Sequence, residues 1–148
     1  MGLLENKVAI ITGSGSGIGK ATALLFAKEG ASIVVSDIND ADGQKVADEI
    51  VANGGKAIYV HANTAQADDN KQLVDEAVKA FGAVHIAVNN AGVGSAFHKL
   101  ADVEISDWQR VIDINLTGVF YGMKYQIPAM AAAKGGSIIN IASILEQV

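Results

Sequence analysis

The residues with the clearest chemical potential form a glycine-rich loop, residues 12–19, which reads TGSGSGIG. The loop follows a short apolar run and precedes an amphipathic segment, so it is expected to join a strand to a helix. Glycine allows a tight turn and a close backbone approach, and the free amides at a helix N-terminus bind anions. This arrangement predicts a cradle for a pyrophosphate.

The spacing of the glycines indicates which type of nucleotide-binding loop the sequence resembles. A Gly-x-Gly-x-x-Gly register fails, because it would require glycine at Ile18 or Lys20. The pattern Thr-Gly-x-x-x-Gly-x-Gly fits, with Gly13, Gly17 and Gly19. No Lys-Ser or Lys-Thr pair follows the last glycine, which excludes a nucleotide triphosphatase loop. A glycine-rich connection without a ligand is the alternative interpretation.

Asp37 is the second candidate, because it ends the next apolar run, 18 residues after Gly19. A carboxylate in this place accepts hydrogen bonds from the ribose hydroxyls of an adenosine. Its charge repels a 2′-phosphate, and no Arg or Lys stands beside it or at Ser14 to compensate. The prediction is therefore NAD in preference to NADP. A turn-forming aspartate is the alternative for Asp37 taken alone.

These loops need a parallel sheet to position them. Apolar runs rich in Val and Ile, without polar alternation, are typical of strands covered on both faces, and they occupy residues 8–12, 32–37, 57–62, 85–89 and 137–142. Amphipathic segments between them predict helices over residues 18–28, 41–52, 69–81 and 106–133. The alternation predicts an α/β fold with a doubly wound parallel sheet of Rossmann type, in a single domain over residues 1–148.

Local signals predict where two of the helices begin and end. Asp68 and Asp69 precede the third helix and suit its positive end as caps. Ser106, with Gln109 three residues later, predicts a capping box that opens the longest helix. Pro128 is expected to kink that helix or end it about a turn early.

Composition and charge exclude several classes of function. The chain has 11 basic and 16 acidic side chains, a net charge of −5 and no basic cluster, which argues against nucleic-acid partners. It has no cysteine, so disulfides, thiolate zinc sites and cysteine nucleophiles are excluded, and His61, His85 and His98 lack metal-ligand spacing. Without a signal peptide or a membrane-spanning run, a cytoplasmic protein with no membrane partner is expected.

Three further motifs carry a family resemblance. Residues 89–92 read NNAG, residues 114–118 read INLTG and residues 136–143 read GSIINIAS. With the glycine loop, these motifs occur in the order that resembles the amino-terminal part of the short-chain dehydrogenase/reductase family, over essentially the whole chain. The resemblance implies an oxidoreductase that transfers a hydride between a nicotinamide and a small alcohol or carbonyl substrate.

The resemblance also implies a role for each matching residue. Cofactor contacts are implied for Gly13, Ser16, Gly17, Ile18, Gly19, Asp37, Ile38, Asn63, Asn90, Ala91 and Gly92. Ser143 is implied to bind the substrate oxygen and Asn115 to support a proton relay, which makes them the candidate catalytic residues. At Asn63 the family often has an aspartate that contacts adenine, and the Asn63 carbonyl oxygen can still accept a hydrogen bond. These matches also have structural alternatives: a strand stop at Asn89 and Asn90, a helix kink or packed amide at Asn115, and a strand-end hydroxyl at Ser143.

One element of the family pattern is absent from this sequence. The family carries a Tyr-x-x-x-Lys pair beyond the serine, whereas the sequence ends at Val148, and Tyr59, Tyr121 and Tyr125 have no lysine four residues later. The 148-residue chain is therefore expected not to catalyse hydride transfer at an appreciable rate, for want of a base.

Two alternatives to an enzyme remain open at this point. One is a dinucleotide-binding module without turnover. The other is an inactive fragment that associates through a bare apolar strand at residues 137–142 and through the long helix, where family members oligomerise. A homo-oligomer is expected for the full-length form. The sequence does not select a particular substrate.

Overall fold

The sheet and its helices follow the predicted alternation. The computed structural model describes residues 2–95 and 98–143 of the chain. The strands are β1 (Val8–Thr12), β2 (Ser32–Asp37), β3 (Lys56–His61), β4 (Ile86–Asn89) and β5 (Ser137–Asn140). The helices are α1 (Gly17–Lys28), α2 (Asp40–Ala52), α3 (Ala67–Phe81), α4 (Ile105–Ile112) and α5 (Gly118–Ala132), with a short 3₁₀ turn at Leu100–Asp102 and a π-helical segment, η2 (Asp113–Thr117). The α/β fold class is confirmed.

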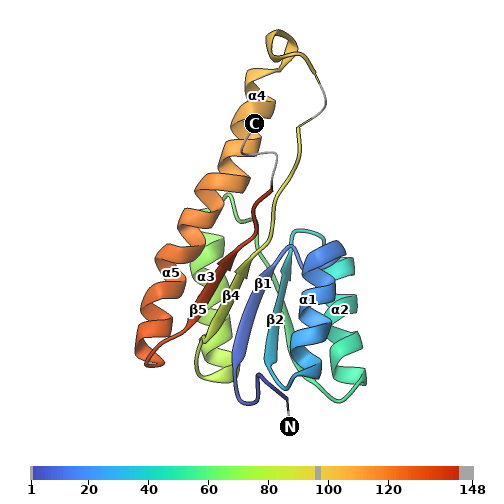
Figure 1. The fold of residues 1–148 in the computed structure, drawn as a ribbon, viewed down its shortest axis with the longest axis vertical. Coiled ribbons are helices and arrows are strands. Elements are labelled where there is room, and N and C mark those ends of the chain that lie inside the picture. Colours follow the sequence, from blue (N-terminus) through green and yellow to red (C-terminus); the bar gives the residue numbers. More distant parts are fainter. Residues whose placement is uncertain (1, 96–97, 144–148) are drawn as a thin grey trace.

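All strand pairs in the sheet are parallel, and the strand order is β3-β2-β1-β4-β5. The chain moves outward from β1 to β2 and β3, then crosses back to β4 on the other side of β1 (Figure 1). Loops that leave β1 and β4 therefore diverge, and such a reversal of strand order opens a crevice at the carboxyl ends of the strands.

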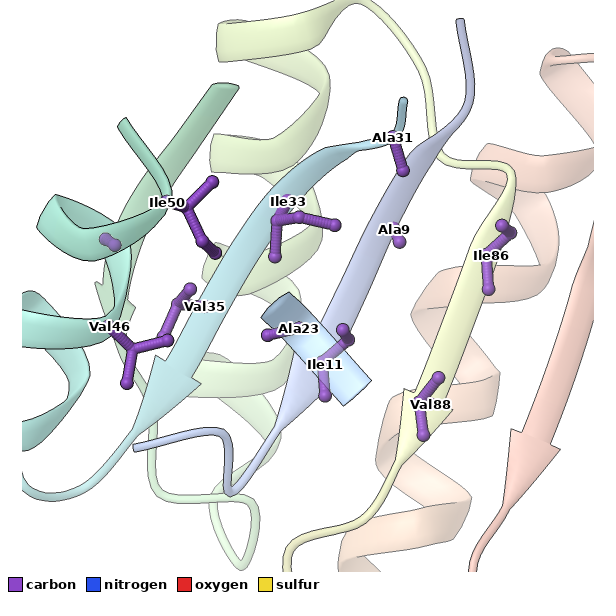
Figure 2. Close-up of a cluster of buried hydrophobic side chains, with 11 residues drawn as sticks. Ala9, Ile11, Ala23, Ala31, Ile33, Val35, Val46, Ile50, Ile86 and Val88 are labelled. Atoms are coloured by element: carbon purple, nitrogen blue, oxygen red, sulfur yellow. The ribbon is translucent and has the colours of Figure 1, made fainter. Parts of the chain in front are cut away.

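Apolar side chains on β1 alternate between two core layers. Ala9 and Ile11 join a cluster beneath α1 and α2, together with Ile33 and Val35 of β2 (Figure 2). Ile10 points to the opposite face, into a cluster beneath α3 and α5. Every residue of β1 is buried, as expected for a strand that is covered on both faces.

The longest predicted helix is interrupted in the structure. In place of one helix over residues 106–133, α4 passes into the π-helical segment Asp113–Thr117 and then into α5. A π segment contains an extra residue in its turn, and such segments are frequent at functional sites. Asn115 lies in this segment.

The structure corrects three smaller predictions about helix ends, in whole or in part. Helix α4 begins one residue early, so Glu104 takes the cap position, Ser106 lies in the first turn, and no capping box forms. An early end of the helix at Pro128 is wrong, because Pro128 lies inside α5, which continues to Ala132 with buried residues on both sides of the proline. Asp68 and Asp69 lie within the first turn of α3, after Gln66 at the cap position.

Candidate functional site

A cleft of about 400 Å³ lies at the carboxyl ends of β1 to β4. Its lining includes these residues that the sequence predicted to contact a cofactor: Gly13, Ser16, Ile18, Asp37, Ile38, Asn63, Asn90, Ala91 and Gly92. Sequence reasoning gave no role to the other lining residues, which are Ala62, Thr64, Val93 and Ile114. The fold thus brings together residues from five separate segments of the chain.

The glycine loop is shaped by close packing as much as by backbone conformation. Gly13 and Gly17 have φ angles of 62° and 54°, in the left-handed region that favours glycine. A Cβ atom on Gly13 would lie 2.9 Å from the Cα of Ala91, and one on Gly19 would lie 2.3 Å from the Gly13 carbonyl oxygen. Gly19 is therefore needed for the approach of α1 to the loop, and neither Gly17 nor Gly19 lines the cleft itself.

Reciprocal hydrogen bonds of the Thr12 and Asn90 side chains hold the glycine loop against the turn that follows β4. The Thr12 Oγ1 atom accepts hydrogen bonds from the backbone N–H groups of Asn90 and Ala91, both at 3.0 Å. In return, the Asn90 Nδ2 atom donates to the carbonyl oxygens of Thr12 at 3.0 Å and Gly13 at 3.2 Å. Sequence reasoning missed the role of Thr12, although a polar residue that ends a buried strand signals a need for hydrogen-bond partners.

The Asp37 carboxylate faces the same cleft and is held by two backbone amides. Its Oδ2 atom accepts from the N–H of Gly15 at 2.9 Å, and its Oδ1 atom accepts from the N–H of Asn39 at 3.0 Å. Each carboxylate oxygen has a second lone pair for a ligand. Asp37 therefore shapes the turn and lines the cleft at once.

Ser14 was expected to be a position where a lysine or arginine could pair with a 2′-phosphate, and the structure corrects this expectation. The Ser14 side chain is fully buried, and its Oγ donates to the Ile11 carbonyl oxygen at 2.7 Å and accepts from the Ser36 N–H at 3.0 Å. Position 14 therefore does not face the cleft. Ser16 and Ile38 do, and no lysine or arginine lines the cleft among the residues that the structure describes.

Asn63 lies in the cleft wall after β3, with part of its hydrogen-bonding capacity in use. Its Oδ1 atom accepts from the Ala65 N–H at 3.0 Å, and its backbone N–H donates to Asp69 Oδ2 at 2.8 Å. The side-chain oxygen that was expected to accept from adenine thus also forms a turn, and it keeps one further lone pair.

The Asn115 side chain connects the π-helical segment η2 to the loop after β4 through two hydrogen bonds. Its Nδ2 atom donates to the Val93 carbonyl oxygen at 2.8 Å, and its Oδ1 atom accepts from the Val93 N–H at 2.9 Å. Arg110 adds a third tie, because its Nη2 atom donates to the Gly94 carbonyl oxygen at 3.0 Å. Asn115 does not line the cleft, although its neighbour Ile114 does.

Ser143 is exposed and follows β5 at the edge of the described sheet. Asn140 at the end of β5 is in register with Asn89 at the end of β4. Because the strands are parallel, the chain after Asn140 leaves the sheet at the same end as the cleft. Ser143 is not part of the cleft lining.

The described part of the chain contains neither a cluster of metal ligands nor a membrane-spanning helix. Within residues 2–95 and 98–143, no three His, Asp or Glu side chains gather as metal ligands, and no helix is long and apolar enough to span a membrane. His85 has a structural contact, since its Nδ1 atom accepts from the Val8 N–H at 3.1 Å. Trp108 is 58% exposed on α4 and so lies outside the core.

Fold and site together define a Rossmann-type α/β domain with a glycine loop at the switch point of the sheet. Residues 7–148 match the short chain dehydrogenase family. The chain belongs to this family.

Comparison with curated proteins gives several relatives with different activities. The chain is 58% identical over 140 residues to cyclohexanol dehydrogenase of Acinetobacter sp. (strain SE19), covering 95% of this chain and 56% of that protein. It is 45% identical over 142 residues to 2,5-dichloro-2,5-cyclohexadiene-1,4-diol dehydrogenase of Sphingobium indicum (95% and 56%). It is 45% identical over 148 residues to 3-oxoacyl-[acyl-carrier-protein] reductase of Synechocystis sp. (97% and 58%). The chain spans about half the length of these relatives.

Proposed function

We propose that the chain is the NAD-binding part of an oxidoreductase that interconverts an alcohol and a carbonyl compound. One observation carries the proposal: the glycine loop, Asp37 and the Asn90–Gly92 turn were predicted from separate stretches of sequence, and they line a single cleft. Membership of the short chain dehydrogenase family supports the reaction class. The cytoplasmic location expected from the sequence stays a prediction.

The donors and acceptors in the cleft suit a dinucleotide with free ribose hydroxyls. The glycine loop at the start of α1 offers backbone amides to a pyrophosphate. Asp37 offers acceptors to the adenosine ribose, and Ser16 and Ile38 carry no positive charge that could pair with a 2′-phosphate. Bound there, NAD would accept or supply the hydride, while Ala91 and Gly92 would line the nicotinamide side.

On the reactive side, we assign Ser143 to hydrogen-bond the substrate oxygen and Asn115 to support the proton relay. Asn115 is suited to a supporting role because both ends of its amide hold the Val93 backbone beside the cleft. The relatives' names include a cyclic alcohol, a chlorinated diol and an acyl-carrier-protein ketone, so the proposal stays at the class of alcohol or carbonyl substrates.

We include self-association in the proposal, as expected from the sequence. Helix α4, η2 and α5 form a long rod that projects past the sheet (Figure 1). Large apolar side chains on it are exposed, including Leu116 at 64%, Phe120 at 56% and Ile127 at 55%. Burying such side chains against a second copy would remove apolar area from water.

The test is a calorimetric titration of the protein with NAD and with NADP. The wild type is expected to bind NAD at least about tenfold more tightly, since a charge-assisted hydrogen bond contributes about 1.5–3 kcal/mol. Asp37→Ser combined with Ile38→Arg should reverse the preference. Asp48→Ser, which removes an exposed carboxylate on α2 bonded to Gln44, is the matched charge control and should leave it unchanged.

Two results would overturn parts of this proposal. Tighter binding of NADP than of NAD by the wild type would contradict the role of Asp37. Binding of neither cofactor would contradict the nucleotide site altogether. Cofactor binding without turnover is expected of this chain on either interpretation, because its sequence has no Tyr-x-x-x-Lys pair to supply the base.

A further inference from the structure

Three polar side chains outside the cleft lining gather behind Asp37. Tyr59 and His61, two residues apart on β3, both reach Asp40, the first residue of α2. The Tyr59 hydroxyl lies 2.7 Å from Asp40 Oδ1, and His61 Nδ1 lies 2.7 Å from the same oxygen atom. Nothing in the proposed function so far uses this cluster.

The Tyr59 hydroxyl joins the two ends of the turn between β2 and α2. Besides its contact with Asp40, it lies 2.8 Å from the Asp37 carbonyl oxygen. A tyrosine hydroxyl has a single hydrogen to donate, so it sits between two acceptors that it serves in turn. Both acceptors are therefore drawn toward one point on β3.

The Tyr59 ring is fixed against the start of α2. A Cβ atom on Gly43 would lie 2.2 Å from the ring Cε2 atom, so only glycine leaves room for the ring at this position. The ring is half-buried and packs against the core layer beneath α1 and α2. The hydroxyl consequently has little freedom to leave the turn.

These contacts complete a three-point attachment of Asp37. Its two carboxylate oxygens accept from the N–H groups of Gly15 and Asn39, and its carbonyl oxygen meets the Tyr59 hydroxyl. The first two bonds fix the carboxylate relative to the glycine loop, and the third fixes the backbone that carries it. A binding group that is held in place before the ligand arrives loses less entropy on binding.

We propose that Tyr59, whose hydroxyl lies between the Asp37 carbonyl oxygen and Asp40 Oδ1, is a positioning residue that preorganises the Asp37 carboxylate for the two ribose hydroxyls of an adenosine nucleotide. The inference rests on the proposed function and deepens it. The recognised group is a vicinal diol on the adenosine side of the ligand. Ligands without that group should not sense the Tyr59 hydroxyl.

The decisive variant is Tyr59→Phe, which keeps the ring and removes the hydroxyl. Loss of one hydrogen bond to the turn should weaken NAD binding about three- to tenfold and leave the binding of nicotinamide mononucleotide, which lacks the adenosine, unchanged. Tyr125→Phe is the matched control on the opposite face of the sheet, and it should bind NAD like the wild type.

A double-mutant cycle with Asp37→Asn separates positioning from general stability. If Tyr59 acts through Asp37, then adding Tyr59→Phe to Asp37→Asn should change the NAD affinity by less than about twofold. Additive losses would overturn the proposal, as would equal weakening of nicotinamide mononucleotide. An unchanged NAD affinity in Tyr59→Phe alone would overturn it as well.

Hydrogen exchange provides a measurement that does not depend on a ligand. In Tyr59→Phe the backbone amides of Gly15 and Asn39 should exchange faster than in the wild type, because both donate to the Asp37 carboxylate. Unchanged exchange would contradict the positioning role even if the wild type bound no dinucleotide. Failure of the proposed function and failure of this inference thus give different results.

Discussion

The two sides of the sheet differ in how firmly they hold their candidate functional groups. On the side of β2, Asp37 is attached at three atoms, every residue of β1 is buried, and so are the four central residues of β2. On the side of β5, Asn115 and Ser143 are exposed, and Ile139 in the edge strand is 41% exposed. The side that carries Asp37 is thus closely packed within the described residues, whereas the side that carries the candidate catalytic groups borders open surface.

This difference indicates which properties can be tested separately. Groups on the buried side depend on core packing and close backbone contacts, so substitutions there should affect stability and binding strongly. Groups on the exposed side depend on a few hydrogen bonds between helix and loop, so single substitutions there should leave the fold largely intact.

A matched pair of isoleucines gives the largest expected difference. Ile11 in β1 is fully buried and Ile139 in β5 is 41% exposed. Ile11→Ala should lower the free energy of unfolding by about 2–5 kcal/mol, through lost burial and a cavity. Ile139→Ala should cost about 1 kcal/mol or less. Denaturant midpoints at an unchanged slope would measure both, and equal losses would remove the distinction between the two sides.

A buried polar pair that joins β4 to α5 should give the next largest effect. Gln126 is 1% exposed, and its Nε2 atom donates to Asn89 Oδ1 at 2.8 Å. Gln126→Leu would leave that oxygen without this donor and should cost about 1–3 kcal/mol of stability. Gln44→Leu removes an exposed bond to Asp48 and is the control, expected to cost about 0.5 kcal/mol or less. A cost for Gln126→Leu no greater than that of the control would contradict the importance of the pair.

The glycine loop gives a smaller effect that should appear in binding. Gly13 and Gly54 both have positive φ angles, but only Gly13 has neighbours that a Cβ atom would meet. Both alanine variants should lose about 1 kcal/mol of stability through backbone strain, and Gly13→Ala should lose more because its Cβ atom would meet the Ala91 backbone. Gly13→Ala should also weaken NAD binding at least about tenfold, or about 1.4 kcal/mol, by pushing the loop from the β4 turn.

The affinity of Gly54→Ala decides whether that result is specific. If it falls as much as that of Gly13→Ala, then backbone strain anywhere in the fold is enough, and the close approach of Gly13 to Ala91 has no special role. If Gly13→Ala binds NAD like the wild type, the loop is an ordinary connection, which was the alternative interpretation of the sequence.

The strands of the sheet could be predicted well because each one is a short run of apolar residues that is recognisable in the local sequence. Buried Val and Ile runs place β1 and β2 to the residue, and the glycine spacing identifies the loop at the switch point. The π-helical segment around Asn115 had no such signal, since residues 106–133 have a continuous helical pattern. Its amide bonds to Val93 join segments 22 residues apart, and no local pattern encodes such a contact.

The support behind the candidate site was equally hidden from the sequence. Nothing in the spacing indicates that Thr12 Oγ1 accepts from two backbone amides on another loop. Likewise, Tyr59 was considered only for a lysine four residues later, and its contact with Asp37 depends on the register between β2 and β3. Motifs indicate which residues meet a ligand, whereas the residues that hold them in place emerge from the fold.

Alkaline pH should give the smallest effect and should still distinguish the Asp37 side. The pKa of Tyr59 is raised far above its usual value, chiefly by partial burial. The hydrogen bond to Asp40 and the negative charges of Asp40 and Asp37 raise this pKa further. A group whose pKa is raised in the folded state gives stability that is complete below its unfolded pKa, about 10 for tyrosine, and is lost as the pH rises beyond that value. His61, which shares Asp40 Oδ1 with Tyr59, faces the same cluster.

The comparison of wild type with Tyr59→Phe isolates this contribution. Between pH 8 and 9 the two proteins should differ in stability by a constant amount. Above about pH 10 the wild type should lose stability faster, and the slope of its stability against pH should correspond to the release of up to one more proton on unfolding. Phenylalanine has no proton to release, whereas Tyr125→Phe on the opposite face keeps the Tyr59 hydroxyl and should follow the wild type. Urea midpoints across this pH range would measure the difference. Parallel curves for wild type and Tyr59→Phe would show that the folded environment does not hold the Tyr59 proton, and the close bond to Asp40 would then not form in solution.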